Sequence, residues 1–310
     1  MNPLYNRRRI VQWLAGASVA FWGARTWAAP AGSPPKRIVC MSWELTETLL
    51  ALGYTPVGIP LPGWYRSTIA EPVLPEGVAN TGLLFQPNFQ VLLDLAPDLL
   101  MLTAGHAGLQ PALARLAPTV ILGDYMSSAQ PYPALQQDTR QMARVLNASS
   151  RAEALIADTE QIVERVHQHL AAQPALLALP TFVAEVVDEH YVRVYGPGSL
   201  FDAMLQKIGV SNAASLAGWS QTLAGFAMVP VQRLARAPIA NLLLVTPISP
   251  EPLEALQHNP IWQALPGVRE NRVALLPVIA PEGGLVSMQR FALAVEQALV
   301  QTANQEPAFV

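Results

Sequence analysis

The sequence predicts an α/β protein made of two α/β lobes with mainly parallel sheets, joined by one long connecting helix. The first observation is that helix-like segments alternate with short apolar runs in both halves of the chain, as expected for buried parallel strands. The second is one long helical pattern between the halves. The third is size, because about 280 residues remain after an N-terminal signal, enough for two domains. Of the 310 residues, 51% are hydrophobic and 13% are charged, which suits two substantial cores.

The start of the chain has the layout of an export signal. Arg7–Arg9 precede a largely apolar stretch, Ile10–Trp22, and no acidic residue occurs before residue 29. This stretch is shorter than the ~20 apolar residues that a membrane span needs. Asn6–Val11 resembles a twin-arginine signal, which implies export of a folded protein, although an ordinary secretory signal or an uncleaved anchor also fits. We expect a cleaved signal peptide over 1–28 and a periplasmic protein.

The first half is expected to form an N-terminal lobe over residues 36–148. Proline and glycine residues separate its short apolar runs from its helical patterns. Strands are expected at Arg37–Met41, Pro56–Ile59, Asp98–Leu102 and Thr119–Leu122, and helices at Glu44–Leu52, Phe89–Leu95 and Leu109–Leu116.

The second half repeats this scheme and predicts a C-terminal lobe over residues 178–303. Strands are expected at Thr181–Val187, Asn241–Thr246 and Arg272–Leu276, and helices at Leu200–Ile208 and Phe291–Val300. A leucine-rich helix followed by Ala-Pro and a strand occurs in both halves, at 90–101 and 232–245. Two similar lobes would produce this echo, and so would chance.

The segment over 149–172 is the most regular part of the chain. Ser150 and Glu153 have the spacing of a capping box, and apolar residues then recur on one helical face until Gln173-Pro174 ends the pattern. A helix of this length spans ~30 Å. It suits a rigid connector between two lobes, and it equally suits a surface helix of one lobe.

Composition and motifs exclude several classes of function. Without the four arginines of residues 1–28, 15 basic residues face 22 acidic ones, a net charge of about −7 that offers no basic face to nucleic acid. The single cysteine, Cys40, lies in an apolar run and is expected to be a buried small hydrophobe. No phosphate loop, nucleophile elbow or zinc-protease motif is present, so no enzyme is predicted. The cluster of Glu185 with residues 188–190 follows a strand and is interpreted as a turn.

Aromatic residues are the more suggestive feature. Six of them fall in or beside predicted loops of both halves: Trp43, Trp64, Tyr65, Phe85, Trp219 and Phe226. Core packing is the ordinary role of such residues. Their position after strands also fits the wall of a cleft between two lobes.

Several stretches together identify a family resemblance that covers nearly the whole chain. They are Trp43–Gly53, Gln86–Asn88 with Ala96–Asp98, Tyr195–Phe201 and Asn259–Pro266. The chain resembles the periplasmic ferric-hydroxamate-binding proteins of siderophore ABC importers. The resemblance implies two lobes on one long helix, no catalysis and no cofactor. It also implies a monomer that captures an iron(III)–hydroxamate siderophore and delivers it to an ABC importer permease.

The resemblance also implies a set of site residues. The ligand-binding residues expected from it and from the aromatic pattern are Trp43, Trp64, Tyr65, Leu84, Phe85, His106, Trp219, Phe226 and Glu282. Because the siderophore wraps its own iron, no metal-ligand cluster is expected. Relatives with the same fold that bind haem, cobalamin or catecholate siderophores remain alternatives, as does an enzyme built on this scaffold.

Three of these positions depart from the family pattern. Relatives have an arginine at Leu84 and a tyrosine at His106, both of which contact hydroxamate oxygens, and tend to have an aromatic residue at Glu282. Leu84 cannot donate a hydrogen bond, and Arg66 or a backbone amide near Phe85 could replace it. His106 could donate through either ring nitrogen or be an ordinary loop residue. The carboxylate of Glu282 favours a ligand with a cationic or hydroxyl-bearing periphery.

Gln90 and Gln232 are expected to face the permease. The resemblance places acids there that pair with permease arginines, whereas glutamine supplies no charge. We therefore expect docking that depends weakly on salt. Both residues would also suit ordinary exposed helix starts.

Overall fold

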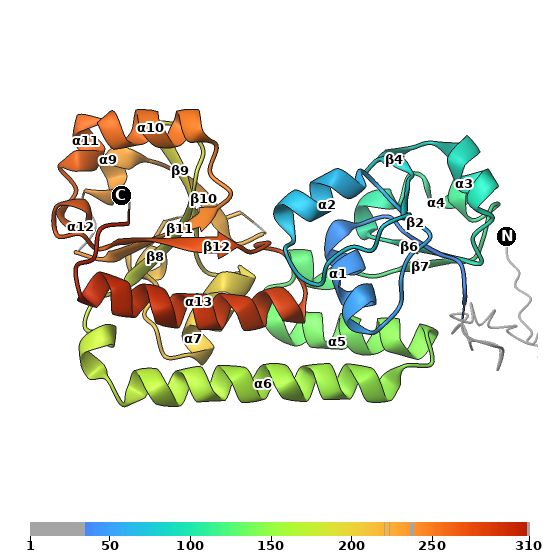
Figure 1. Cartoon of the computed structure of the whole chain (residues 1–310), viewed down its shortest axis with the longest axis horizontal. Coiled ribbons are helices and arrows are strands. Elements are labelled where there is room, and N and C mark those ends of the chain that lie inside the picture. The colour runs from blue at the N-terminus through green and yellow to red at the C-terminus, as the bar shows by residue number, and fades with distance from the viewer. Residues whose placement is uncertain (1–34, 220, 223, 236–238, 309–310) are drawn as a thin grey trace, which may run out of the picture. The chain divides into compact units, whose positions relative to one another are not determined.

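The computed structural model describes residues 35–219, 221–222, 224–235 and 239–308. These residues contain two five-stranded sheets, one formed by the first half of the chain and one by the second half (Figure 1). The predicted signal peptide, 1–28, lies outside the described residues. Among the described helices, none combines the length and the apolar character that crossing a membrane requires.

The first sheet is parallel throughout and lies in the N-terminal lobe. Its order is β3-β2-β1-β6-β7, with parallel pairing between all neighbours. The strands are β1 (Ile38–Cys40), β2 (Gly58–Ile59), β3 (Ala79–Asn80), β6 (Leu99–Leu102) and β7 (Thr119–Ile121). The central strands β1 and β6 are buried along their whole length, which is why they read as continuous apolar runs. Cys40 is fully buried in β1, as predicted, and burial raises the pKa of its thiol to about 11.

Helices and a small hairpin surround this sheet. The helices are α1 (Trp43–Ala51), α2 (Pro62–Thr68), α3 (Phe89–Leu95), α4 (Gln110–Leu113) and α5 (Pro131–Val145), with short 3₁₀ turns at Ala104–His106 and Asp124–Ser127. The hairpin pairs β4 (Gly82–Leu83) with β5 (Gln86–Pro87). The side chain of Asn88 begins α3 by accepting the N–H groups of Gln90 and Val91. The sequence pattern did not predict α2, α5 or the hairpin.

The second sheet, in the C-terminal lobe, is mixed rather than mainly parallel. Its order is β10-β9-β8-β11-β12, and β9 runs antiparallel to both of its neighbours. The strands are β8 (Thr181–Val186), β9 (Tyr191–Tyr195), β10 (Phe226–Pro230), β11 (Asn241–Thr246) and β12 (Val273–Val278). Asp188 explains the reversal, because its carboxylate accepts the N–H groups of His190 (2.8 Å) and Tyr191 (2.7 Å) and closes a tight turn between β8 and β9.

The helices of the second half are mostly short, apart from the last one. They are α7 (Leu200–Lys207), α8 (Ala213–Leu216), α9 (Val231–Leu234), α10 (Pro250–His258), α11 (Pro260–Gln263), α12 (Pro266–Arg269) and α13 (Leu285–Ala303), with a 3₁₀ turn at Pro174–Leu177. Helix α13 packs along α6 and against β12 and α7. The sequence predicted this helix only over Phe291–Val300, and in the structure it begins six residues earlier, at Leu285.

The long helix α6 (Ser149–Ala171) follows the first sheet and precedes the second, and its 23 residues give a length of ~35 Å (Figure 1). The predicted capping box at its start is wrong. The N-cap is Ala148, and no side chain caps the helix. Glu153 instead pairs with Arg140 of α5 at 2.9 Å, because α5 lies beside α6 and offers a guanidinium within reach.

Other contacts reinforce the link that α6 makes. The carboxylate of Glu160 on α6 accepts hydrogen bonds from Tyr132 (2.8 Å) and Gln136 (2.7 Å) of α5 and lies 3.1 Å from Lys207 Nζ of α7. One continuous cluster of buried apolar side chains joins α5 and α6 to α7, α13 and the second sheet. The two lobes therefore share helices and core, not only a tether.

We expect the lobes to move little when ligand binds. Bending α6 would break backbone hydrogen bonds, whereas hinge motion in other proteins turns a few loop dihedrals. Small-angle X-ray scattering of the ligand-free and ligand-saturated protein should give radii of gyration that agree within error. A clear compaction on binding would contradict this expectation.

Candidate functional site

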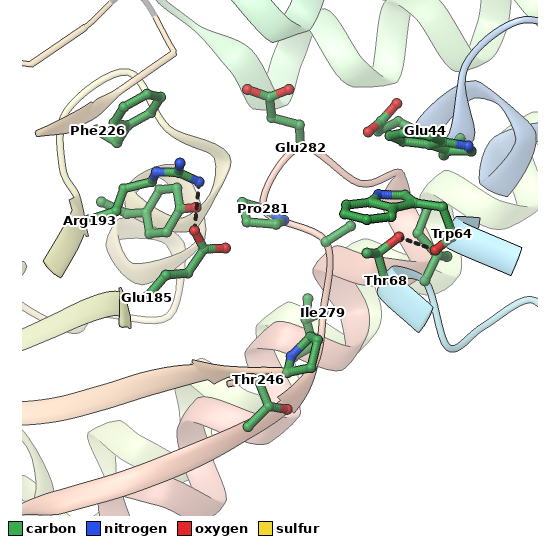
Figure 2. Close-up of a pocket in the computed structure, with 15 residues that line it drawn as sticks. Glu44, Trp64, Thr68, Glu185, Arg193, Phe226, Thr246, Ile279, Pro281 and Glu282 are labelled. Atoms are coloured by element: carbon green, nitrogen blue, oxygen red, sulfur yellow. Dashed lines mark hydrogen bonds and ion pairs between the residues drawn. The ribbon is translucent and has the colours of Figure 1, made fainter. Parts of the chain in front are cut away.

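A pocket of about 260 Å³ lies between elements of the two lobes (Figure 2). Its walls come from α1 and α2 on one side and from β8, β9 and β10 on the other, and the segment between β12 and α13 closes it. The lining residues are Trp43, Glu44, Trp64, Thr68, Ile69, Glu185, Arg193, Tyr195, Phe226, Thr246, Pro247, Ile279, Ala280, Pro281 and Glu282.

Two tryptophans form the wall on the N-terminal lobe. Trp43 opens α1, and its indole N–H donates to the carbonyl of Pro60 (2.7 Å), which fixes the ring. Trp64 lies in the first turn of α2, a helix that begins at Pro62 because proline suits the first helical position. The two ring centroids are 5.7 Å apart, and Trp64 is 54% exposed. A large aromatic surface therefore faces the pocket while half open to solvent.

Four side chains of three neighbouring strands form the opposite wall. Glu185 of β8 lies directly across from Arg193 of β9, and Tyr195 lies across from Phe226 of β10. Residues two apart on a strand share a face, so Arg193 and Tyr195 point to the same side. Arg193 donates through Nη1 to Glu185 (2.7 Å), and its guanidinium lies 4.9 Å from the centroid of Phe226. Burial lowers the pKa of Arg193, but Tyr195 and Glu185 together raise it above its ordinary value, so the side chain stays charged.

Two further carboxylates make the pocket acidic. Glu282 projects from the segment between β12 and α13, between the two walls (Figure 2). Burial raises the pKa of its carboxyl to about 7, helped by repulsion from Glu44. Glu44 accepts a hydrogen bond from Ser42 (2.7 Å), and burial also raises its pKa. One guanidinium thus faces three carboxylates around the cavity.

Beneath the pocket, a buried carboxylate connects the lobes. Glu47 of α1 accepts the backbone N–H of Ser287 (2.8 Å) and its hydroxyl (2.7 Å) at the start of α13. Burial raises the pKa of Glu47 to about 7, while the hydrogen bonds from Ser287 and Gly284 oppose that shift. Nearby, the hydroxyl of Tyr125 donates to the carbonyl of Glu282 (2.8 Å). These bonds hold the segment that carries Glu282 against the N-terminal lobe.

The structure places four of the nine predicted ligand-binding residues in this pocket, namely Trp43, Trp64, Phe226 and Glu282. Tyr65, by contrast, is fully buried in the core, where its hydroxyl donates to Pro72 (2.8 Å). Trp219 is half-buried and stacks on Phe182 at a centroid distance of 5.5 Å, against the core of the C-terminal lobe.

Leu84, Phe85 and His106 form a separate cluster that does not line the pocket. His106 is buried, and its ring nitrogens are both used within the protein. Nδ1 accepts the N–H of Thr103 (3.2 Å), so Nε2 carries the proton and donates to the carbonyl of Leu84 (2.8 Å). Both ring nitrogens are thus hydrogen-bonded within the N-terminal lobe, and a role of His106 in donating to the ligand stays a prediction. Phe85, 52% exposed, covers the histidine ring at 5.0 Å.

Sequence reasoning missed Arg193 and Tyr195 and took Glu185 as part of a turn. The alternation of apolar and polar residues over 191–195 was the available signal, because it is the pattern of a half-buried strand. The turn itself is confirmed at Asp188–His190. The side chains of Asp188, Glu189 and His190 each offer one atom that could bind a metal ion, and these atoms lie within 4.8 Å of one another. The three residues belong to the hairpin and do not line the pocket.

The predicted docking glutamines are both exposed. Gln90 lies in the first turn of α3 and donates to Asp94 (2.9 Å), and Gln232 lies in α9. Neither lines the pocket. Their role in docking stays a prediction.

Comparisons with known proteins agree with this architecture. The family model described as periplasmic binding protein matches residues 38–280. The iron(3+)-hydroxamate-binding protein FhuD of Escherichia coli is 30% identical over 299 residues, covering 96% of this chain and 97% of that protein. The achromobactin-binding periplasmic protein of Dickeya dadantii is 27% identical and covers 77% of each chain.

Solved structures show the same fold. The Fe3+–Desferal-bound siderophore-binding protein FhuD of Vibrio cholerae superposes with a TM-score of 0.79 at 22% identity, over 86% of this chain and 98% of that one. The catecholate-siderophore-binding protein VctP of the same organism gives a TM-score of 0.63 at 16% identity, over 86% of this chain and 95% of that one. These relatives are substrate-binding proteins, which confirms the prediction that the chain is not an enzyme. The family resemblance expected from the sequence is likewise confirmed, and the chain belongs to the periplasmic binding protein family.

Proposed function

We propose that the protein captures an iron(III) siderophore of the hydroxamate class in the pocket between its lobes. One observation carries this proposal: the rings of Trp43 and Trp64 line one side of a cavity, and the guanidinium of Arg193 lines the other side. A hexadentate siderophore surrounds its iron with its own oxygens. Its binding protein therefore needs apolar walls and a few donors, not metal ligands. The iron chelate is cargo, so it is no cofactor of the protein.

The charge of the pocket favours hydroxamates over catecholates. Its three carboxylates outnumber its one guanidinium. Three singly charged hydroxamates neutralise a ferric ion, whereas three doubly charged catecholates leave a strongly anionic complex. An acidic, partly desolvated cavity repels the second kind of complex and accepts the first. The name of the Escherichia coli relative points to the same class.

The cellular setting is part of the same proposal. We infer a monomer exported through the twin-arginine-like signal to the periplasm, which passes the chelate to the permease of an ABC importer. Gln90 and Gln232, exposed on α3 and α9, would meet that permease through hydrogen bonds without ion pairs. This form of docking would depend weakly on salt.

Titration calorimetry with ferric hydroxamates, a ferric catecholate and haem tests the ligand class. We expect a hydroxamate to bind best, and Trp64→Ala to weaken it about tenfold, because an aromatic contact contributes ~1 kcal/mol beyond its buried area. Phe85→Ala is the matched control, since Phe85 is almost equally exposed on the same lobe but lies outside the pocket. Binding of the catecholate or haem in preference to every hydroxamate would overturn the proposal.

A further inference from the structure

We infer that Arg193 is the ligand-anchoring residue of the pocket and donates hydrogen bonds to the oxygen atoms of the bound chelate. This inference deepens the proposed function, because it names the group that would recognise an oxygen-rich iron complex. Arg193 is the one basic residue among the fifteen that line the cavity, all of which the structure describes.

The surroundings of Arg193 hold its side chain in place. Glu185, directly opposite on β8, binds Nη1 at 2.7 Å from one side. The ring of Phe226 lies 4.9 Å from the guanidinium carbon on the other side (Figure 2). An arginine fixed by a carboxylate and an aromatic face loses little further freedom when it binds a ligand, which favours affinity.

The hydrogen bonds of Arg193 leave donors available. A guanidinium has five N–H groups and no acceptor, and the bond to Glu185 uses one nitrogen. Nε is buried and has no acceptor among the described residues. The side chain is nevertheless 40% exposed, toward the cavity that it lines. The same fork therefore binds Glu185 and offers N–H groups to an incoming oxygen.

Two neutral donors of the opposite wall are already used within the protein. The indole N–H of Trp43 is used by Pro60, and the hydroxyl of Thr68 donates to the carbonyl of Trp64. Iron-bound hydroxamate oxygens carry negative charge, and charge-assisted bonds from a guanidinium to such oxygens are the strong kind. The geometry also separates two roles, since Arg193 would contact the ligand whereas Glu185 would position Arg193.

Binding of Arg193 variants, measured by titration calorimetry, tests this inference. The ligand is whichever ferric chelate of the hydroxamate, catecholate and haem panel the wild type binds best. Arg193→Gln should weaken binding about tenfold or more, and Arg193→Lys should recover part of the loss, because it keeps the charge but not the fork. Arg272→Gln is the matched control. Arg272 forms a similar pair with Glu270 (2.9 Å) in the same lobe, outside the pocket.

Each outcome has a distinct meaning. Wild-type affinity in Arg193→Gln, or an equal loss in Arg272→Gln, would overturn the role of Arg193. The proposed function could still stand in both cases. If the wild type binds only the catecholate or haem, the proposed ligand class fails, and loss of that binding in Arg193→Gln would still support the anchor. Absence of binding to every chelate would overturn both.

Discussion

Replacing Glu47 by alanine is expected to lower the free energy of unfolding by about 3 kcal/mol. The N-cap of helix α13 is Gly284, which has no side chain to cap the first turn. Glu47 supplies that cap from α1, 240 residues away in sequence, by accepting the N–H and hydroxyl of Ser287. Alanine would leave the buried N–H and hydroxyl of Ser287 without an acceptor, and each buried donor left unsatisfied costs ~1–3 kcal/mol.

Urea unfolding of three variants checks this. Glu47→Gln keeps one oxygen for the Ser287 N–H and should lose less stability than Glu47→Ala. Glu76→Ala, the removal of a glutamate that is 96% exposed, should be nearly neutral. A Glu47→Ala protein as stable as Glu76→Ala would show that the bond between the lobes contributes nothing.

The affinity for a cationic ferric chelate should fall about tenfold from about pH 8 to about pH 6. The pKa of Glu282 is raised to about 7, so its carboxyl is ionised above that pH and neutral below it. A cationic ligand prefers the ionised carboxylate. Its binding must therefore expel a proton at low pH, and one released proton limits the change to tenfold per pH unit. The contribution of Glu282 to affinity is therefore complete well above pH 7 and is lost as the pH falls through about 7.

The ferric complex of Desferal, which carries a free ammonium group, is a suitable probe for this effect. Its N-acetylated form has the same iron-binding core without the cation and should bind with little pH dependence. Glu282→Gln should remove the dependence for the cationic form. A cationic complex that binds equally at both pH values would exclude Glu282 as its partner.

The sequence predicted most of the buried parallel strands and the long helix α6 because their signals are local. Phe89–Leu95 and Asn241–Thr246 were predicted with the bounds that the structure has, since Asn88 caps the first and a buried apolar run forms the second. The hairpin of β9 was missed. Its five residues are centred on Arg193, and the residues before it were interpreted as a turn without a partner strand. A short strand at the edge of an apolar run has too few residues to show its period.

The site was harder to predict because it depends on contacts between distant residues. Aromatic residues near loops were equally good candidates for core and cleft. Tyr65 is buried in the core and Trp219 packs against it, whereas Trp43 and Trp64 face the cavity. His106 was expected in the site through the family resemblance, yet its ring joins two loops of one lobe. The partnership of Glu185 and Arg193 depends on the β8–β9 register, and no local pattern in the sequence states that register.

Cys40 gives the protein a practical property. The only thiol of the chain lies within the N-terminal sheet, inaccessible and protonated at neutral pH. Maleimide dyes should therefore not react with the native protein and should label only an engineered surface cysteine. Val73, 76% exposed, and Leu216, 65% exposed, offer one attachment point in each lobe. With a donor and an acceptor dye on cysteines introduced at those two positions, energy transfer would report the distance between the lobes, and Cys40 would not have to be removed.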